Sequence, residues 1–428
     1  MMTIGIILLI ILFCIGIPIW SALSLGAIFL IVNAVGSPVQ NIPLYFFNAI
    51  DNFTLMAITF FLMAGSVMAY CGPSQYIFNI VNSFFGRRRG GLAITSVVMC
   101  MIYAAITGSS TATLAGVAEL ARPEMLKKGY DNVFISSLLA ASCTLGQMIP
   151  PSILMILYGT MVQANTGVLF IAGVVPGIFS GIVLCFMAWF LSPELDKSEI
   201  VENPEQYTWP YRCKALLKGL PALTMPFAVL GSIYAGLVTP TEAGALAAVY
   251  SFIVALLYRK LTWKSFKQSF ISTINSNSMI FILVAGALLF ANPITFMRIP
   301  QQISSIIVSW GLGATQLMFV ASGLIFVLGM FLDVIPILYL TMPVLYPALV
   351  SVGVNLVHFN VIMILCLQIG QISPPFGTAL YVSAGVCEAP VEKVAIGVTK
   401  YIIAYILITV VIIFVPGLSL WLPRIMGH

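Results

Sequence analysis

Two short motifs place glycine, glutamine and paired prolines inside long apolar stretches of the chain. Gly146–Pro151 reads GQMIPP, and Gly370–Pro375, which reads GQISPP, follows 224 residues later. Proline removes a backbone donor and clashes with the preceding helical turn, so each stretch must break there. The carbonyl oxygens of a broken helix can bind a hard cation such as sodium, and the N–H groups of a half-helix N-terminus attract a carboxylate. The motifs therefore predict neighbouring sites for a cation and an organic anion.

Polar side chains that could complete these sites lie in two other apolar stretches. A cluster of hydroxyl residues runs from Thr107 to Thr113, and the sequence Gly329–Asp333 ends in a carboxylate. Small hydroxyl residues in membrane helices often serve close packing alone, so the cluster is better evidence than any of its members. A carboxylate inside an apolar stretch is costly and by default functional, although a structural pairing remains the alternative for Asp333. Glu242, which closely follows Pro240, is better explained as a helix cap.

The composition places these motifs in a membrane protein. Of the 428 residues, 61% are hydrophobic and 7% are charged, whereas an ordinary soluble domain carries about 25% charged residues. Apolar runs long enough to cross a bilayer recur along the chain and predict ten to twelve crossings. The stretch 1–32 has no basic region or clear cleavage site, so we expect a retained helix kinked at Pro18, or two short helices. The eight cysteines show no metal-binding spacing and fit apolar packing.

The positions of the 18 Lys and Arg residues indicate membrane orientation rather than nucleic-acid binding. The basic groups at 87–89, 127–128, 212–218 and 259–267 are predicted to face the cytoplasm. Spacing of about 224 residues matches the first two groups to 308–313 and 348–357, which contain no Lys or Arg. Equivalent loops of the two halves therefore differ in charge, as expected if they lie on opposite sides of the membrane in an inverted-topology repeat. Gly108 and Gly329 give a weaker match at a similar spacing.

The predicted fold is an all-α polytopic membrane protein with two inverted repeats, each containing a re-entrant helical hairpin. Irregular backbone at membrane depth is tolerated where it is buried in protein or lines a wet cavity, so the hairpin tips should face an internal site. The predicted parts are N-terminal scaffold helices at 1–50, a first repeat at 51–191 with its hairpin near 132–160, a polar connection and amphipathic segment at 192–218, scaffold helices at 219–270, and a second repeat at 271–428 with its hairpin near 361–385.

Five stretches of the sequence resemble the large M subunit of TRAP (tripartite ATP-independent periplasmic) transporters. They are Ala121–Asp131 (ARPEMLKKGYD), Gly146–Ser152, Val238–Ala243 (VTPTEA), Gly329–Asp333 and Gly370–Thr378. The resemblance covers essentially the whole chain. It implies an ion-transporter-type fold in the bacterial inner membrane, with a scaffold and a mobile elevator domain. It also implies sodium-coupled uptake, a separate small four-helix Q subunit and a soluble periplasmic substrate-binding protein.

The resemblance assigns sodium ions to the hairpin tips and the helices that face them. The residues carried over are Ser109, Ser110, Gly146, Met148 and Pro150 for one site, and Gly329, Gly370, Ile372 and Pro374 for its pseudo-symmetric mate. The polar residues predicted to contact the substrate, or to couple it to sodium, are Asp333, Thr111, Thr113, Ser152, Ser373 and Thr378. No organic cofactor is expected. The implied substrate is a small organic acid, either sialic acid or a C4-dicarboxylate, and the resemblance favours sialic acid without a residue that decides it.

Three other functions are alternatives for a sequence of this kind. A sodium-coupled dicarboxylate or citrate symporter of the same broad fold would work without a binding protein. A membrane-embedded enzyme is disfavoured because the sequence contains no HExxH motif, no triad constellation and only two histidines, His358 and His428. A channel is disfavoured because two inverted hairpins suit alternating access better than a continuous pore.

Overall fold

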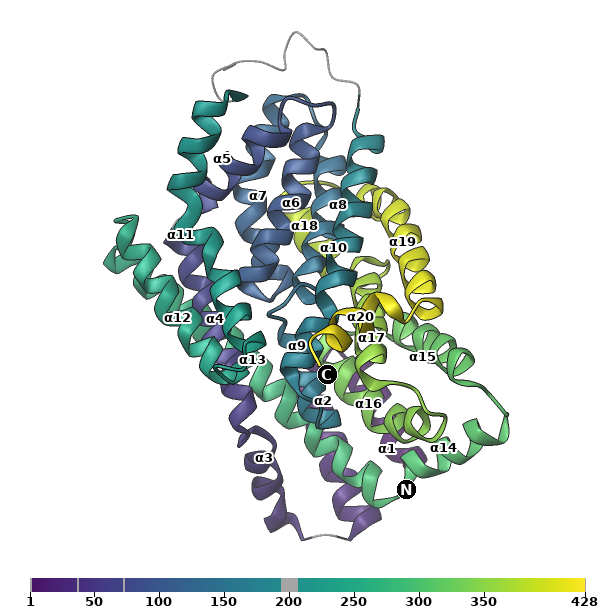
Figure 1. Ribbon diagram of the computed structural model, residues 1–428. Helices are drawn as coiled ribbons and strands as arrows, with labels where there is room; N and C mark the ends of the chain where they lie inside the picture. Colours follow the sequence, from purple (N-terminus) through teal and green to yellow (C-terminus); the bar gives the residue numbers. More distant parts are fainter. Residues whose placement is uncertain (1, 37, 72–73, 194–206, 428) are drawn as a thin grey trace.

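The computed structural model describes residues 2–36, 38–71, 74–193 and 207–427, and every regular element in these ranges is a helix (Figure 1). Seven of the helices in these ranges are long and apolar enough to cross a membrane. Five shorter apolar segments of 10–17 residues accompany them. Most of the shorter segments end at, or start from, the broken motifs, because glycine and proline interrupt the helices there. The structure therefore agrees with the prediction of a polytopic all-α membrane protein.

The N-terminal stretch forms two short helices rather than one kinked helix. α1 (Met2–Cys14) and α2 (Ile19–Leu30) are separated by Gly16, at a φ of 83°, and by Pro18. The two helices pack against each other, and a Cβ at Gly5 would lie 2.5 Å from the Leu30 side chain. A third helix, α3 (Ile42–Ile50), follows.

Four long helices form one flank of the molecule (Figure 1). They are α4 (Met56–Tyr70), α11 (Trp209–Tyr234), α12 (Pro240–Leu257) and α13 (Trp263–Phe296). α4 packs against both α12 and α13, and α12 also packs against α11. The expected boundary at 270–271 lies inside α13, which continues unbroken from Trp263 to Phe296. Residues 194–206 of the predicted polar connection lie outside the described ranges.

The cap predicted for Glu242 is confirmed. Thr239 is the N-cap of α12, and its side chain accepts a hydrogen bond from the Glu242 backbone N–H. The Glu242 carboxylate accepts one in return from the Thr239 N–H at 2.7 Å. Glu242 thus completes a capping box.

Two sets of helices repeat in the same order, with equivalent helices about 224 residues apart. The first set comprises α5 (Ser74–Phe85), α6 (Gly91–Thr107), α7 (Ser110–Lys127), α8 (Asn132–Cys143), α9 (Ile153–Val162) and α10 (Thr166–Leu191). The second comprises α14 (Ile299–Ser309), α15 (Ala314–Gly329), α16 (Val334–Ser351), α17 (Leu356–Ile372), α18 (Thr378–Val386) and α19 (Val391–Phe414), followed by α20 (Gly417–Ile425). In each set one pair of helices, α6–α7 or α15–α16, precedes a second pair, α8–α9 or α17–α18. The Ser96 hydroxyl, near the start of α6, lies 3.4 Å from the Met125 sulfur, near the end of α7, so α6 and α7 lie side by side and form a hairpin.

Contacts between α8–α9 and α17–α18 show that the two repeats run in opposite directions. The Arg122 side chain donates to the Asn132 side chain, at the start of α8, and to Glu388, just after the end of α18. At the opposite end, the Tyr158 hydroxyl of α9 donates to the Leu356 carbonyl oxygen at the start of α17, at 2.8 Å. Each segment therefore begins where the other ends, as inverted repeats require. The hairpins predicted near 132–160 and 361–385 are thus broken helices, because the chain continues toward the far end after the paired prolines.

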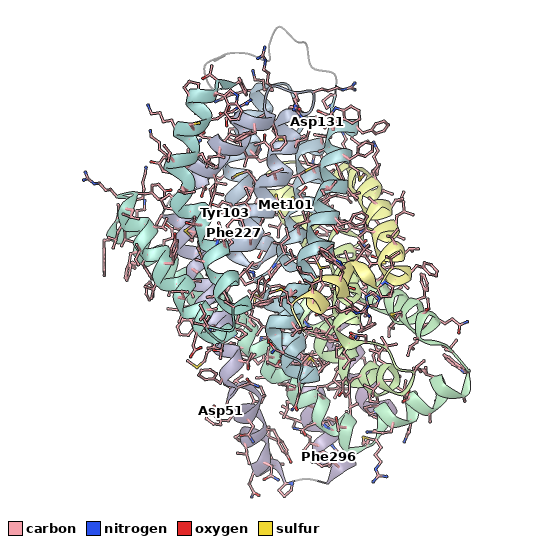
Figure 2. All side chains as sticks on the ribbon, viewed as in Figure 1. Asp51, Met101, Tyr103, Asp131, Phe227 and Phe296 are labelled. Carbon is pink, nitrogen blue, oxygen red and sulfur yellow. The ribbon has the colours of Figure 1, made fainter. Side chains whose placement is uncertain are left out.

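The basic segments gather at one end of the molecule. The Arg212 side chain donates to the Ser83 carbonyl oxygen at 3.0 Å, which joins the start of α11 to the end of α5. The Tyr258 hydroxyl donates to the Lys218 carbonyl oxygen at 2.6 Å, which brings the end of α12 alongside α11. Asp131, which follows the basic pair 127–128, lies at the opposite end of the molecule from Asp51 (Figure 2). The positive-inside rule predicts that the basic end faces the cytoplasm.

Candidate transport site

The turns between α6 and α7 and between α15 and α16 form one side of the candidate site. Between α6 and α7, Gly108 adopts a left-handed φ of 62° and Ser109 is extended. A Cβ at Gly108 would lie 2.6 Å from the Pro151 carbonyl oxygen, so both the backbone angle and the space require glycine. The second turn, between α15 and α16, ends at Asp333, the N-cap of α16. Ser109 and Asp333 therefore occupy equivalent positions, at the start of the second helix of each pair.

The breaks of the two broken helices, α8–α9 and α17–α18, meet next to these turns, and each break carries a cis bond between its paired prolines. The Gln147 amide Nε2 donates to the Gln371 Oε1 at 2.7 Å. One turn earlier, the Gln368 Nε2 donates to the Thr144 carbonyl oxygen at 2.8 Å. The two residues of each bond are 224 positions apart, so both bonds join equivalent points of the repeats. The pseudo-two-fold axis thus passes through the region where the two breaks meet.

A cavity of about 430 Å³ opens where these turns and breaks face α4 and α13. The hydroxyl-bearing side chains on its walls, apart from Tyr70, are Ser66, Thr107, Ser109, Ser110, Thr111, Ser272 and Ser276. On α7 the lining residues run from Ser110 at the turn to Glu119, in the direction of Lys127. The cavity therefore extends from the turns and breaks toward the basic end of the molecule.

The cavity combines two helix N-termini with two carboxylates. The first residues of α7 and α16 both line it, and neither the Ser109 nor the Asp333 side chain accepts a hydrogen bond from the backbone of its own helix. The first turns of these helices therefore present N–H groups and the positive end of the helix dipole to the cavity. Asp333 and Glu119 supply carboxylates, and none of the described lining residues is Lys, Arg or His.

The residues predicted for the first sodium site lie close together. Ser109 and Ser110 line the cavity. Gly146 packs so tightly behind them that a Cβ there would lie 2.9 Å from the Ser109 carbonyl oxygen. Met148 and Pro150 are buried in the break between α8 and α9 and do not line the cavity. The structure therefore places hydroxyl and carbonyl oxygens from the turn and the break next to one another.

The residues predicted for the second sodium site surround a direct backbone contact. A Cβ at Gly370 would lie 2.5 Å from the Gly329 Cα, so α15 and α17 touch through their backbones. Ile372 is buried at the end of α17, and Pro374 is half-buried in the break that follows. In the same region the Phe376 backbone N–H donates to the Met330 carbonyl oxygen at 3.2 Å. These four residues lie beside the turn between α15 and α16, behind the cavity wall rather than on it.

The residues predicted to contact substrate divide into two groups. Thr111 and Asp333 line the cavity. The other four hydroxyls form hydrogen bonds within the protein: Thr113 with Thr107, Ser152 with the Gln147 carbonyl oxygen, Ser373 with the Ile369 carbonyl oxygen, and Thr378 with Asp333. Thr113, Ser152 and Ser373 are buried. The observed hydrogen bonds hold the turns and the breaks in shape.

The structure adds lining residues that the sequence did not single out. Gln147 and Gln371 belong to the repeated motifs, and their chemical role could have been suspected because a polar amide recurs at equivalent positions. Ser272 and Ser276 are one turn apart on α13, so they lie on one face of that helix. Glu119 lies three and four residues beyond Gly116 and Ala115, which also line the cavity, so helical periodicity on α7 was the available signal.

Inverted repeats and broken helices around an internal polar cavity define a polytopic membrane transport protein. A family model described as "Tripartite ATP-independent periplasmic transporter, DctM component" matches residues 6–418. The chain belongs to this family. It is a multi-pass protein of the bacterial inner membrane and a transporter permease.

Similar proteins include several large permeases. The chain is 32% identical over 390 residues to the C4-dicarboxylate TRAP transporter large permease protein DctM of Pseudomonas aeruginosa, covering 91% of this chain and 90% of that one. It is 28% identical over 413 residues to the sialic acid TRAP transporter large permease protein SiaM of Vibrio cholerae, with 96% and 95% covered. It is 32% identical over 408 residues to the isethionate TRAP transporter permease protein DctMQ of Oleidesulfovibrio alaskensis, covering 95% of this chain and spanning 64% of that relative.

A solved structure supports the fold alone. The crystal structure of the Alcanivorax borkumensis YdaH transporter, described as having an unusual topology, matches with a TM-score of 0.60 and 12% sequence identity. The match covers 88% of this chain and 87% of the other.

Proposed function

We propose that this chain is the large membrane subunit of a sodium-coupled importer of a small organic acid. The observation that carries the proposal is the meeting of two inverted broken helices and two helix turns around one polar cavity. This arrangement presents positive helix ends and oxygen ligands side by side, and these groups suit an anion and a sodium ion respectively.

Sodium acts here as a co-transported substrate. A hard cation prefers oxygen ligands. The Ser109 carbonyl oxygen lies against Gly146, and Ser109 and Ser110 line the adjoining cavity. The second ion would bind between the backbone of Gly329 and Gly370 and the residues Ile372 and Pro374 at the break. Sodium in these positions offsets the charges of Asp333 and Glu119, and so permits an acid to enter a cavity whose described lining contains no basic side chain.

The transport step that best fits this architecture is an elevator movement. In that mechanism the broken helices and the pairs α6–α7 and α15–α16 would move together against α4 and the long helices α11–α13. The cavity lies between these two groups, with Ser66, Ser272 and Ser276 on one wall and Ser109–Thr111 on the other. It extends toward the basic end, which corresponds to an arrangement open to the cytoplasm.

The proposed partners are a small Q-type membrane subunit and a soluble periplasmic substrate-binding protein. The family description contains the word tripartite, and the name of the isethionate relative joins M and Q. The names of the relatives include C4-dicarboxylates, sialic acid, isethionate and 2,3-diketo-L-gulonate, all organic acids. A stand-alone symporter is the rival function.

The test is uptake into proteoliposomes that contain this chain, with and without the small subunit, the binding protein and an inward sodium gradient. We expect uptake of a labelled acid only when all four are present. Uptake at the same rate without a sodium gradient would refute sodium coupling. Full activity without the binding protein would support the stand-alone symporter instead.

A further inference from the structure

Gln147 and Gln371 form a buried amide bridge between the breaks of α8–α9 and α17–α18, at the pseudo-two-fold axis. The Gln371 Oε1 accepts hydrogen bonds from the Gln147 Nε2 at 2.7 Å and from the Ser110 hydroxyl at 3.2 Å. Each glutamine is only 4% exposed, yet both line the cavity. The bridge is therefore held rigidly by the protein on one side and faces the cavity on the other.

One acceptor of this bridge is left over. The Gln147 Oε1 is buried and has no hydrogen-bond partner within the described part of the chain. A buried carbonyl oxygen without a donor is unfavourable, and such atoms are uncommon in native structures. The leftover atom is an acceptor, so the group that satisfies it must carry an O–H or an N–H.

The charged groups of the cavity also require donors. Asp333 and Glu119 can only accept hydrogen bonds when ionised. A simple dicarboxylate dianion brings acceptors alone, so it leaves all three groups without a donor. It also adds two negative charges to a cavity in which sodium must already offset the charges of Asp333 and Glu119. A polyhydroxylated monocarboxylate brings one negative charge and several donors.

The hydroxyls on the opposite walls lead to the same class of ligand. Ser272 and Ser276 on α13 and Ser66 on α4 face the cavity from the side opposite to Ser110. A hydroxyl can both donate and accept, so these side chains suit a ligand that carries hydroxyls along its length. A short dicarboxylate dianion bound at the helix N-termini has no hydroxyl group to hydrogen-bond with these serine side chains.

We infer that the amide bridge binds hydroxyl groups of the substrate, with the Gln147 side chain as the specificity-determining hydrogen-bond acceptor. The cavity then binds a polyhydroxylated monocarboxylate in preference to a C4-dicarboxylate dianion. This inference rests on the proposed function, since it concerns the substrate of the same site. The carboxylate of the ligand lies at the helix N-termini beside Ser110, and its hydroxyl chain extends past Gln147.

The test measures ligand-induced thermal stabilisation of the purified permease with its small subunit in sodium chloride. The probes are gluconate, gulonate and N-acetylneuraminate, compared with succinate and fumarate. We expect at least one polyhydroxylated acid to bind on the order of tenfold more tightly than succinate, because a satisfied acceptor and one fewer charge each favour it. Equal or tighter binding of succinate would overturn the inference.

Gln147→Leu should remove most of this preference, weakening the polyhydroxylated acid on the order of tenfold and leaving succinate nearly unchanged. Gln368→Leu is the matched control, because Gln368 is equally buried in the second broken helix and does not line the cavity. It should leave the preference intact. If Gln147→Leu does not fold, Gln147→Glu keeps an acceptor at this position and should still prefer the hydroxylated acid.

The same variants separate the two proposals. Sodium-dependent uptake that persists in Gln147→Leu with an unchanged preference refutes the role of the bridge and leaves the proposed function standing. The absence of sodium-dependent uptake of every acid by the wild-type system refutes the proposed function, and the inference with it.

Discussion

The contact between Gly329 and Gly370 permits a quantitative prediction about the second sodium site. A Cβ at Gly370 would lie 2.5 Å from the Gly329 Cα and 2.9 Å from its carbonyl oxygen. Carbon atoms in good contact are about 3.5–4.0 Å apart, so Gly370→Ala must separate the two helices by about 1 Å. The neighbouring atoms are backbone, and no side-chain rotation can relieve the clash.

Two consequences follow from this separation. Over-packing of a tight interior typically costs about 1–3 kcal/mol, so Gly370→Ala should lower the thermal stability of the permease. A displacement of about 1 Å also spoils the arrangement of carbonyl oxygens around a cation, because oxygen ligands of hard cations lie within a few tenths of an ångström of about 2.4 Å. The sodium concentration needed for half-maximal uptake should therefore rise severalfold.

Gly323→Ala is the matched control for this substitution. Gly323 lies on the same helix, α15, and a Cβ there meets nothing within 4 Å. Alanine favours a helix over glycine by up to about 1 kcal/mol, so this variant should be as stable as the wild type or slightly more stable, with unchanged sodium dependence.

The assay is differential scanning fluorimetry of each purified variant, followed by uptake at graded sodium concentrations. The double variant Gly329→Ala/Gly370→Ala should lose less stability than the sum of the single variants, since the first methyl group already parts the helices. Gly370→Ala with the stability and sodium dependence of Gly323→Ala would show that the backbone contact is neither tight nor part of the ion site.

Three further predictions concern the turns and the ends of the broken helices. Ser110→Ala should raise the sodium concentration needed for half-maximal uptake, because a hydroxyl ligand is lost, and an unchanged sodium titration would move the ion elsewhere. Asp333→Asn should slow uptake per folded molecule severalfold or more while the protein still inserts into the membrane, since the charge is removed and the shape is kept; normal uptake with lowered thermal stability would make the carboxylate structural. The Arg122 guanidinium holds the pKa of Glu388 below its usual value. Their ion pair therefore stabilises the protein above about pH 4.5, and this contribution is lost as the pH falls through the lowered pKa. The melting temperatures of Glu388→Gln and the wild type should converge on acidification, and a difference that stays constant with pH would contradict this linkage.

The features that the sequence predicted well are those fixed by local chemistry. Paired prolines interrupt a helix, and Gly108 also ends one. The interruptions at these residues could therefore be placed to within a few residues. The capping box at Thr239 and Glu242 is likewise a short-range pattern. The inverted repeat was visible because the charge bias of the loops follows membrane orientation.

The features that the sequence did not predict depend on contacts between distant segments. The residues that neighbour Gln147 in the sequence do not indicate that its hydrogen-bond partner is Gln371 rather than a water molecule. Glu119 has basic neighbours in sequence, as a residue near a membrane interface would, but the cavity extends along α7 as far as this residue. Ser272 and Ser276 follow closely after the expected boundary at 270–271, although α13 passes through this region without a break. In each case the position of the cavity, and not the residue type, decides the role.

The two halves of the site are related by symmetry but differ in charge, and this difference suggests how cation and anion are arranged. The equivalent N-cap positions are Ser109 in the first repeat and Asp333 in the second. A carboxylate at a helix N-terminus neutralises the positive end of the dipole, so the N-terminus of α16 is a poor position for an acid and a better one for a sodium ion. The N-terminus of α7 keeps its positive potential and is surrounded by the hydroxyls of Ser110 and Thr111. We therefore expect the substrate carboxylate at α7, with the charge of Asp333 directed toward the second sodium ion.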